Sequence, residues 1–175
     1  IAVRAIRLGA DFERVCSFLQ WKEFEKLAAR AYEANGYSVT SNFRFKQAGK
    51  QWEIDLLACK EPLIVCVDCK HWHHGWSRAA IMKAVEMQMK RTKALADSFY
   101  VVYQKIGLET WKQAIFIPTV LSLTQGPFKF YNKVPIVPVL KIRNFLYELP
   151  AYTFSLTHFS IKIESERHKL TKYLK

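Results

Sequence analysis

The strongest constraint on the fold is an apolar run that ends in charged residues. Leu63–Val67 contains only apolar and cysteine side chains, and Asp68-Cys69-Lys70 follows directly. The length of the run, its β-branched residues and the Glu61-Pro62 break before it predict a buried strand. Because side chains alternate along a strand, Asp68 and Lys70 should share one face, with Cys69 on the other. Two explanations are open: an ion pair that closes the strand end, or a catalytic site.

A second acidic residue, Asp55, lies in the strand-like run just before it. Residues 52–58 are joined to the later strand by only four residues, a connection short enough for an antiparallel hairpin. This pairing would bring Asp55 near Asp68. Two carboxylates held close together repel each other unless a divalent cation lies between them.

A helix is predicted before the strands, from Gln20 to Asn35, with Gly36 closing it. Its apolar residues recur at spacings of three and four, which is an amphipathic pattern. Glu25 falls on the edge of the apolar face, where an acid is unusual. A half-exposed flanking position is the other explanation for Glu25.

The order of these segments resembles the PD-(D/E)XK nuclease superfamily, which has the restriction-endonuclease-like fold. Within it the chain looks most like the Mrr-type restriction endonucleases and the archaeal Holliday junction resolvases. In two positions it departs from the pattern: Ile54 replaces the name-giving proline, and Asp68 stands where Glu is frequent. The resemblance spans residues 20–95, and its motifs are Phe24-Glu25-Lys26-Leu27, Gly36-Tyr37-Ser38-Val39, Ile54-Asp55 and Asp68-Cys69-Lys70-His71-Trp72.

The resemblance implies an α/β fold, with a restriction-endonuclease-like core of a central mixed β-sheet flanked by helices, and a C-terminal extension. We expect an N-terminal helical segment at residues 1–19, a nuclease-like core at 20–125, and an extension at 126–175 that packs on the core. The implied activity is endonucleolytic hydrolysis of DNA, duplex or branched. Mg²⁺ or Mn²⁺ would be held by Asp55, Asp68 and Glu25, and Lys70 would complete the catalytic set.

The charge of the chain favours a polyanionic partner. Lysine and arginine number 27 against 15 acids, which gives a net charge of +12. No stretch is long and uncharged enough for a membrane span, and no pattern for a small-molecule cofactor is present. Dimerisation is reasonable for an enzyme that cuts both strands. The candidate nucleic-acid-binding residues are Arg44, Lys46, Lys50, His71, Trp72, Arg78 and Gln88.

Each of these candidates has a structural alternative. The turn at residues 46–51 is also what a solvated hairpin turn looks like, and Trp72 is equally suited to covering the strand end. Arg78 and Gln88 belong to a long helix that Ser77 caps and that runs to about Ala96. Its solvent-facing side is expected to carry Arg78, Lys83, Lys90, Arg91 and Lys93.

A competing signal is the Cys66-x-x-Cys69 pair, which is followed closely by three histidines, because zinc favours such ligands. Positions three apart on a strand face opposite ways, so both thiols cannot easily reach one ion. Buried structural cysteines in a reducing cytoplasm are the better interpretation. A zinc-stabilised nucleic-acid-binding protein and a non-catalytic binding module on a nuclease fold remain as alternatives to the enzyme.

The remaining elements are predicted from their patterns. Residues 11–19 form a short helix, and Tyr37–Phe45 the first strand. Ala114–Leu123 is a strand that Pro118 makes bent or places near an edge. Val134–Ile142 is a further strand and Arg143–Leu149 a short helix, while residues 153–163 fit either period.

Overall fold

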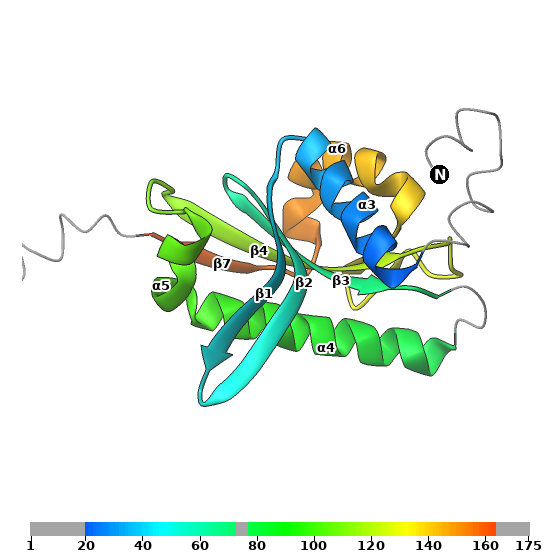
Figure 1. Ribbon diagram of the computed structural model, residues 1–175, viewed down its shortest axis with the longest axis horizontal. Helices are drawn as coiled ribbons and strands as arrows, with labels where there is room; N and C mark the ends of the chain where they lie inside the picture. The colour runs from blue at the N-terminus through cyan, green and yellow to red at the C-terminus, as the bar shows by residue number, and fades with distance from the viewer. Residues whose placement is uncertain (1–19, 73–76, 164–175) are drawn as a thin grey trace, which may run out of the picture.

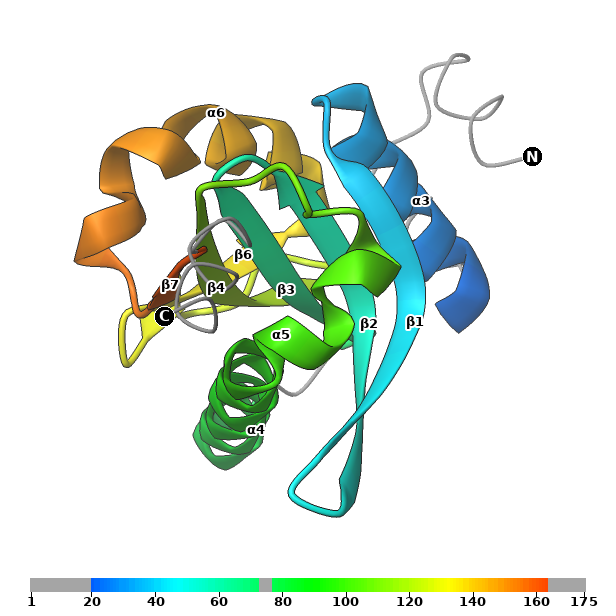
Figure 2. The ribbon, with the colours of Figure 1, turned by 90° about the vertical axis from the view of Figure 1, so that its left-hand side faces the viewer.

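The computed structural model describes residues 20–72 and 77–163. The predicted helix at residues 11–19 lies outside this part of the chain. A twisted mixed sheet forms the centre, with helices on both faces (Figure 1 and Figure 2). The predicted fold class is therefore confirmed. None of the helices that the structure describes is long and apolar enough to cross a membrane.

Helix α3, Trp21–Ala34, forms where the amphipathic pattern predicts it. At its start the Gln20 N–H donates to Glu23 Oε2 at 3.0 Å, which satisfies a backbone group that the helix leaves unpaired. At its end Gly36 adopts a positive φ of 81°, and its N–H donates to the Glu33 carbonyl at 2.9 Å. Glycine adopts this conformation without steric cost, so the chain turns directly into the first strand.

The sheet has the order β1-β2-β3-β4-β6-β5, and β7 pairs with β4. The first three strands form an antiparallel meander, whereas β3 and β4 are parallel and are connected through α4. Strand β3 has the predicted bounds. The strands are β1 Ser38–Gln47, β2 Lys50–Lys60, β3 Leu63–Lys70, β4 Gln113–Ser122, β5 Phe130–Tyr131, β6 Val134–Pro138 and β7 Phe159–Lys162.

Two layers of helices cover the sheet. Helices α3 and α6 pack on one face, and α4 and α5 on the other. Strand β3 is buried on both faces, because its odd-numbered apolar residues join the α3 core and Ile64 and Cys66 join the α4 core. The helical segments besides α3 are α4 Arg78–Asp97, α5 Phe99–Val102, η1 Tyr103–Ile106, η2 Val139–Lys141, α6 Ile142–Tyr152 and η3 Thr153–Ser155.

Strand β4, expected to be bent or near an edge because of Pro118, lies inside the sheet between β3 and β6. The edge of β4 that faces away from β3 is shared by two strands. Strand β7 pairs with it as far as Phe116, and β6 begins pairing at Val120. Pro118 falls in the interval between them, where that edge carries no ladder. A residue without an N–H is therefore tolerated in an interior strand.

The C-terminal part follows the predicted order with shifted bounds. The strand expected over Val134–Ile142 stops at Pro138 and continues as η2, and the short helix extends to Tyr152. Residues 153–163, which the sequence leaves open, form η3 and then β7. The proposed division at residue 125 stays a prediction.

Helix α4 is fixed to the sheet by a buried amide. Gln88 is fully buried, and its Nε2 donates to the Cys66 carbonyl at 2.7 Å. Cys66 is the residue of β3 whose ladder partner is Pro118. The bond joins the middle of α4 to the middle of the sheet, and therefore sets the position of the helix along β3.

Replacing Gln88 with alanine should lower the free energy of unfolding by about 2–3 kcal/mol, because the side chain leaves a void and a buried carbonyl loses its bond. Lys90→Ala, an exposed position on the same helix, should change it by less than about 0.5 kcal/mol. Urea melts of the two variants check this. Equal stabilities would show that the amide does not fix the helix.

Candidate active site

Asp68 is the only charged side chain among the buried residues that the structure describes. It lies near the end of β3 on the face that α4 covers, and its side chain is 2% exposed. Removing a carboxylate from water is costly unless cations and hydrogen bonds compensate it. The surroundings of Asp68 must therefore supply positive charge.

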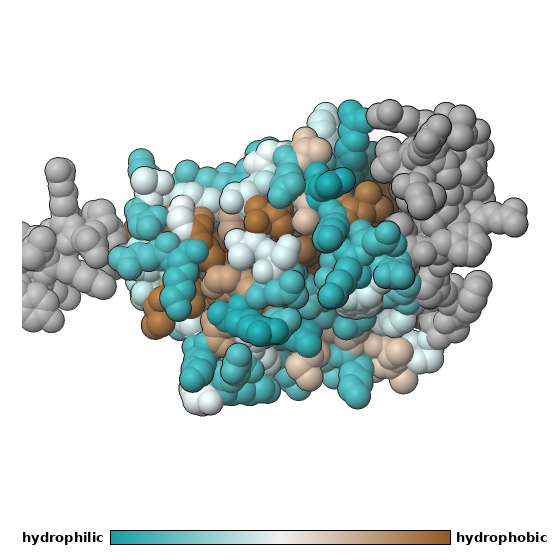
Figure 3. All heavy atoms as spheres, viewed as in Figure 1, coloured by the Kyte–Doolittle hydropathy of each residue, from teal (hydrophilic) through white to brown (hydrophobic). Residues whose placement is uncertain are grey.

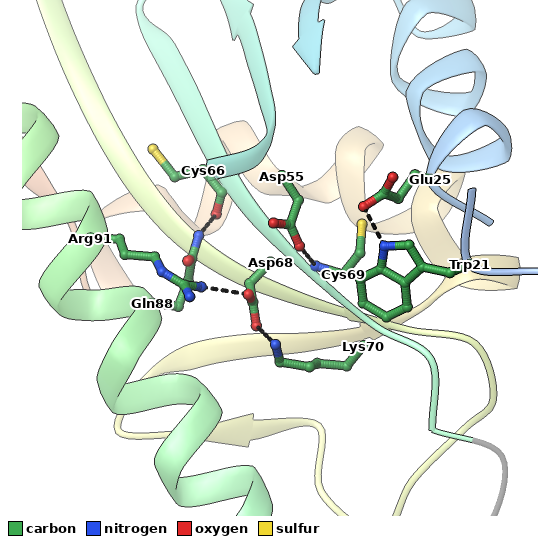
Figure 4. Close-up of polar contacts among 9 residues, drawn as sticks. All are labelled: Trp21, Glu25, Asp55, Cys66, Asp68, Cys69, Lys70, Gln88 and Arg91. Atoms are coloured by element: carbon green, nitrogen blue, oxygen red, sulfur yellow. Dashed lines mark hydrogen bonds and ion pairs between the residues drawn. The ribbon is translucent and has the colours of Figure 1, made fainter. Parts of the chain in front are cut away.

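Two cations supply that charge, one to each oxygen of the carboxylate. Lys70 Nζ lies 2.8 Å from Asp68 Oδ2, and Arg91 Nη1 donates to Asp68 Oδ1 at 2.6 Å (Figure 4). The Lys70 contact confirms that Asp68 and Lys70 share a face of the strand. Arg91 comes from α4, so the site joins the sheet to the helix that follows it.

Asp55 lies on β2, one residue beyond the last pair of its ladder with β3. The ladder between β2 and β3 runs from Lys60↔Leu63 to Leu56↔Val67, and the next residues along the two strands are Asp55 and Asp68. Beyond the end of this ladder a side chain takes the place of a backbone acceptor: Oδ2 of Asp55 accepts a hydrogen bond from the Cys69 N–H at 2.8 Å. The Asp55 carboxylate thus lies beside the residue that follows Asp68, and the charge of Asp68 acts on it.

The ladder on the other side of Asp55 is interrupted as well. Strands β1 and β2 pair at Ser41↔Leu56 and at Phe43↔Ile54, but not at the position between them. There Asn42 has a positive φ of 51°. Asp55 therefore occupies a break in both ladders, and its carboxylate is directed by the Cys69 N–H.

The pKa of Asp55 is raised from 3.8 to about 6, chiefly by burial and to a smaller extent by the negative charge of Asp68. The Cys69 N–H, Lys70 and Arg91 act in the opposite direction. Near neutral pH the two carboxylates are thus only partly compensated. Additional positive charge between them would be favourable.

The four predicted catalytic residues face two hollows. Asp68 and Lys70 line a cavity of about 350 Å³ against α4, which we call the α4 cavity. Asp55 and Glu25 line another of about 420 Å³ against α3, the α3 cavity. Glu25 is half-buried, and its Oε1 accepts a hydrogen bond from the Trp21 indole at 2.7 Å. The indole therefore orients Glu25 near Asp55 (Figure 4).

The residues present fit a divalent cation of the magnesium type. Asp55 and Asp68 offer hard carboxylate oxygens at one level of two neighbouring strands, and Oδ1 of Asp55 accepts no hydrogen bond from any described residue. The described residues contain no group of three His, Cys, Asp or Glu side chains that could hold one metal ion. Mg²⁺ keeps several waters in its coordination sphere, so two carboxylates are a sufficient anchor.

The cations predicted from the Lys46–Gln51 turn lie on a hairpin arm formed by residues 43–54. This arm projects beyond the rest of the sheet and crosses α4 (Figure 1 and Figure 2). Arg44 pairs with Glu53 at 2.7 Å, and Lys50 lies 3.8 Å from the centre of the Trp52 ring. Lys46 is exposed. The face in Figure 3 is mainly hydrophilic, with its apolar atoms in separate areas.

The other nucleic-acid candidates lie closer to Lys70. Trp72 lines the α4 cavity, and His71 packs beside the rings of Trp21 and Phe24. Arg78 is exposed in the first turn of α4, where Ser77 Oγ accepts from the Ala80 N–H at 3.1 Å. The histidines and the tryptophan that follow Trp72 fall in residues 73–76, outside the described chain.

Two residues of α4 lie elsewhere than expected. Gln88 is buried and bonded to the sheet, so it offers no exposed surface for contact with nucleic acid. Arg91 was expected on the solvent-facing side, but its side chain is 27% exposed and reaches Asp68. The spacing of residues in the sequence could have predicted this position: Ala84, Gln88 and Arg91 follow one another at spacings of four and three, which places Arg91 on the side of α4 that faces the sheet.

The cysteines support the structural interpretation. Cys66 packs in the core on the α4 side and Cys69 in the core on the α3 side, and both are free and buried. Burial raises the pKa of both thiols well above its ordinary value. Zinc binds the thiolate, so this arrangement disfavours a shared zinc ion.

Comparison with known sequences gives a family and a relative. The family model Mrr_cat, described as "Restriction endonuclease", matches residues 17–115. An uncharacterized protein from Archaeoglobus fulgidus is 28% identical over 134 residues, which cover 77% of this chain and 95% of that protein.

Two solved structures are similar at a lower level. The crystal structure of a protein of unknown function, AF1548, has a TM-score of 0.39 at 16% identity, and the match covers 57% of this chain and 46% of that one. This chain therefore matches less than half of that protein. The small subunit R.BspD6I2 of the heterodimeric restriction endonuclease R.BspD6I has a TM-score of 0.37 at 16% identity, over 86% of this chain and 76% of the subunit.

In EDTA, the Asp55→Asn variant should be more stable than the wild type at pH 7, by on the order of 1–3 kcal/mol. The folded pKa of about 6 exceeds the ordinary 3.8, so the native state binds the extra proton. Wild-type stability should therefore fall as the pH rises from about 4 to 6, and remain lower above that range. Asparagine keeps the acceptor for the Cys69 N–H and removes the charge. Thermal melts of both proteins from pH 4 to 8 test this, and parallel stability curves would contradict it.

Changing Cys66 and Cys69 together to serine should lower stability by about 1–3 kcal/mol for each buried hydroxyl. Elemental analysis should find no stoichiometric zinc in the wild type or in the variant. If zinc held the fold, the double variant would unfold and lose one metal ion per chain, because the binding energy of a structural zinc is folding energy.

Proposed function

The chain belongs to the restriction endonuclease family whose model covers residues 17–115, and on this basis we propose that it is a Mg²⁺- or Mn²⁺-dependent endonuclease that hydrolyses DNA phosphodiester bonds. The observation that supports this most is the buried Asp68, paired with Lys70 and followed by Cys69, whose N–H donates to Asp55. A purely structural ion pair at a strand end would not need a second, partly buried carboxylate so near to it.

In this proposal Asp55 and Asp68 hold the metal. When bound, such a metal polarises the phosphodiester and lowers the pKa of a water that serves as nucleophile. The chain contributes the rigid position of its ligands. Asp68 is fixed by burial in β3, and Asp55 is directed by the Cys69 N–H at 2.8 Å. Glu25 would act as an outer residue, directly or through water, with the Trp21 indole setting its orientation.

Lys70 would stabilise the negative charge that builds up on the phosphate. Its side chain is 28% exposed and lines the α4 cavity, so it is reachable from solvent while Asp68 keeps its ammonium in place. A positioned cation of this kind acts on charge that develops in the transition state. Orientation of the attacking water is the second contribution that this position allows.

Affinity for DNA would come from basic side chains on both sides of the site. The hairpin arm carries Arg44, Lys46 and Lys50 on one side, and α4 carries Arg78 and Lys83 on the other. The tip of the arm lies five residues beyond the level of Asp55, or about 17 Å at about 3.4 Å per residue. Backbone contacts there would bind several nucleotides away from the bond that is cut.

His71 and Trp72 would contact the nucleic acid next to the cutting centre, since both adjoin Lys70 in the chain and Trp72 lines the α4 cavity. The proposal assigns residues 20–125 to the nuclease core and residues 126–175 to an extension that would pack on it. The substrate would be duplex or branched DNA, and a homodimer would allow both strands to be cut.

Asp68→Asn and Lys70→Ala should each reduce divalent-dependent cleavage of linear and branched DNA by at least about 100-fold, since each removes a positioned charge at the reacting phosphate. Both variants should keep their affinity for DNA within about threefold, because the backbone contacts lie elsewhere. Cleavage rates with Mg²⁺ or Mn²⁺, and binding measured in EDTA, check the two statements.

The matched controls are Glu86→Gln and Lys105→Ala, which remove the same charges from exposed positions and should cut at the wild-type rate. Wild-type cleavage by either site variant would show that the site is assigned wrongly. DNA binding by the wild type without any cleavage, on linear, single-stranded and branched DNA with both metals, would favour a non-catalytic binding module.

A further inference from the structure

Arg91 is the one charged group of the site to which the proposed function gives no role. It reaches Asp68 from α4 with the shortest contact at the carboxylate, 2.6 Å, while its side chain keeps 27% of its surface exposed. Gln88, one turn earlier, fixes the helix to β3. Arg91 is thus held on a rigid element at a defined distance from the sheet.

Each oxygen of Asp68 has a cation beside it: Arg91 donates a hydrogen bond to Oδ1, and Lys70 forms an ion pair with Oδ2 that is not a hydrogen bond. A divalent cation that uses Asp68 competes with these two positive charges. Lys70 follows Asp68 on the same strand and stays near it in any case. Arg91 has a long side chain on another element and borders a cavity, so it is the partner that can leave.

The α4 cavity, about 350 Å³, is where Arg91 can go. Lys70, Lys83 and Arg91 line it, and Asp68 is the only acid among its lining residues. Once a metal neutralises Asp68, the cavity has three cations and no uncompensated acid. Such a hollow is complementary to a phosphodiester group, and guanidinium binds phosphate through two parallel hydrogen bonds.

We propose that Arg91 has two alternative partners: it neutralises Asp68 in the metal-free protein, and it moves to a phosphate of the DNA backbone when a divalent cation takes Asp68. This inference rests on the proposed function and adds to it a residue outside the acid–acid–lysine set. It explains why a buried carboxylate is stable without metal and yet accessible to one.

The exchange couples the two ligands of the site. A metal that takes Asp68 frees Arg91 for the DNA, and a phosphate that takes Arg91 frees Asp68 for the metal. Each ligand should therefore raise the affinity for the other by the same factor, as linkage requires. Substitution of Arg91 should remove the competition and most of the coupling.

The test uses Arg91→Gln, Arg91→Lys and a matched control, Lys90→Gln, which removes one positive charge from the adjacent exposed position. Titration calorimetry with Mn²⁺ in the absence of DNA gives the first measurement. Arg91→Gln should bind Mn²⁺ about tenfold more tightly than the wild type, in the range typical of site coupling. Lys90→Gln should stay within about twofold, and Arg91→Lys should return toward the wild-type affinity because it restores the competing charge.

The second measurement is cleavage of a DNA duplex at saturating Mn²⁺. Arg91→Gln should cut at least about tenfold more slowly, with a higher KM, although it binds metal more tightly. These two effects have opposite signs, so general loss of folding cannot produce them together. Faster or unchanged cleavage by Arg91→Gln would overturn the phosphate role, and Mn²⁺ affinity equal to that of Lys90→Gln would overturn the competition.

Failure of this inference and failure of the proposed function can be told apart. A wild type that binds no Mn²⁺, or cuts no DNA, removes the proposed function and this inference with it. A wild type that binds Mn²⁺ through Asp68, as shown by loss of binding in Asp68→Asn, and cuts DNA supports the function. In that case an Arg91→Gln variant that behaves like Lys90→Gln removes only the inference.

Discussion

The structure depends on how the charge of one buried carboxylate is compensated. Asp68 lies in the interior at the end of β3, and it is tolerated there because Lys70 and Arg91 each reach one of its oxygens. Replacement by an apolar residue of similar size would often be neutral or stabilising at such a position. The proposed divalent-cation site therefore rests on this buried acid, its two cationic partners and the nearby Asp55.

The same constraint explains the irregularities around it. The ladder of β2 breaks on both sides of Asp55, so its carboxylate can take the Cys69 N–H in place of the backbone. On the helix side, the buried amide of Gln88 fixes α4, which in turn places Arg91. The polar contacts made by Asp55, Gln88 and Arg91 therefore all help to fix the geometry at the end of β3.

Much of this arrangement follows from local patterns in the sequence. The bounds of β3 and the extents of α3 and α4 agree with their apolar periodicity, their caps and their turn residues, because those signals are local. The interior position of β4 could not be predicted, since the sequence of one strand does not reveal that its outer edge is divided between β7 and β6. The pairing of Arg91 with Asp68 depends on how far α4 slides along the sheet, and no pattern within the helix specifies that distance. The two hollows on either side of the acids also arise only from the assembled layers.

The parallel pairing of β3 with β4 has a consequence for when the site comes into existence. Asp55, Asp68 and Lys70 precede α4 in the chain, and α4 belongs to the crossover from β3 to β4. A nascent chain that ends before residue 78 therefore contains the two acids and Lys70, but neither Arg91 nor the helix that covers Asp68. The surroundings of Asp68 are complete only after the crossover has been synthesised.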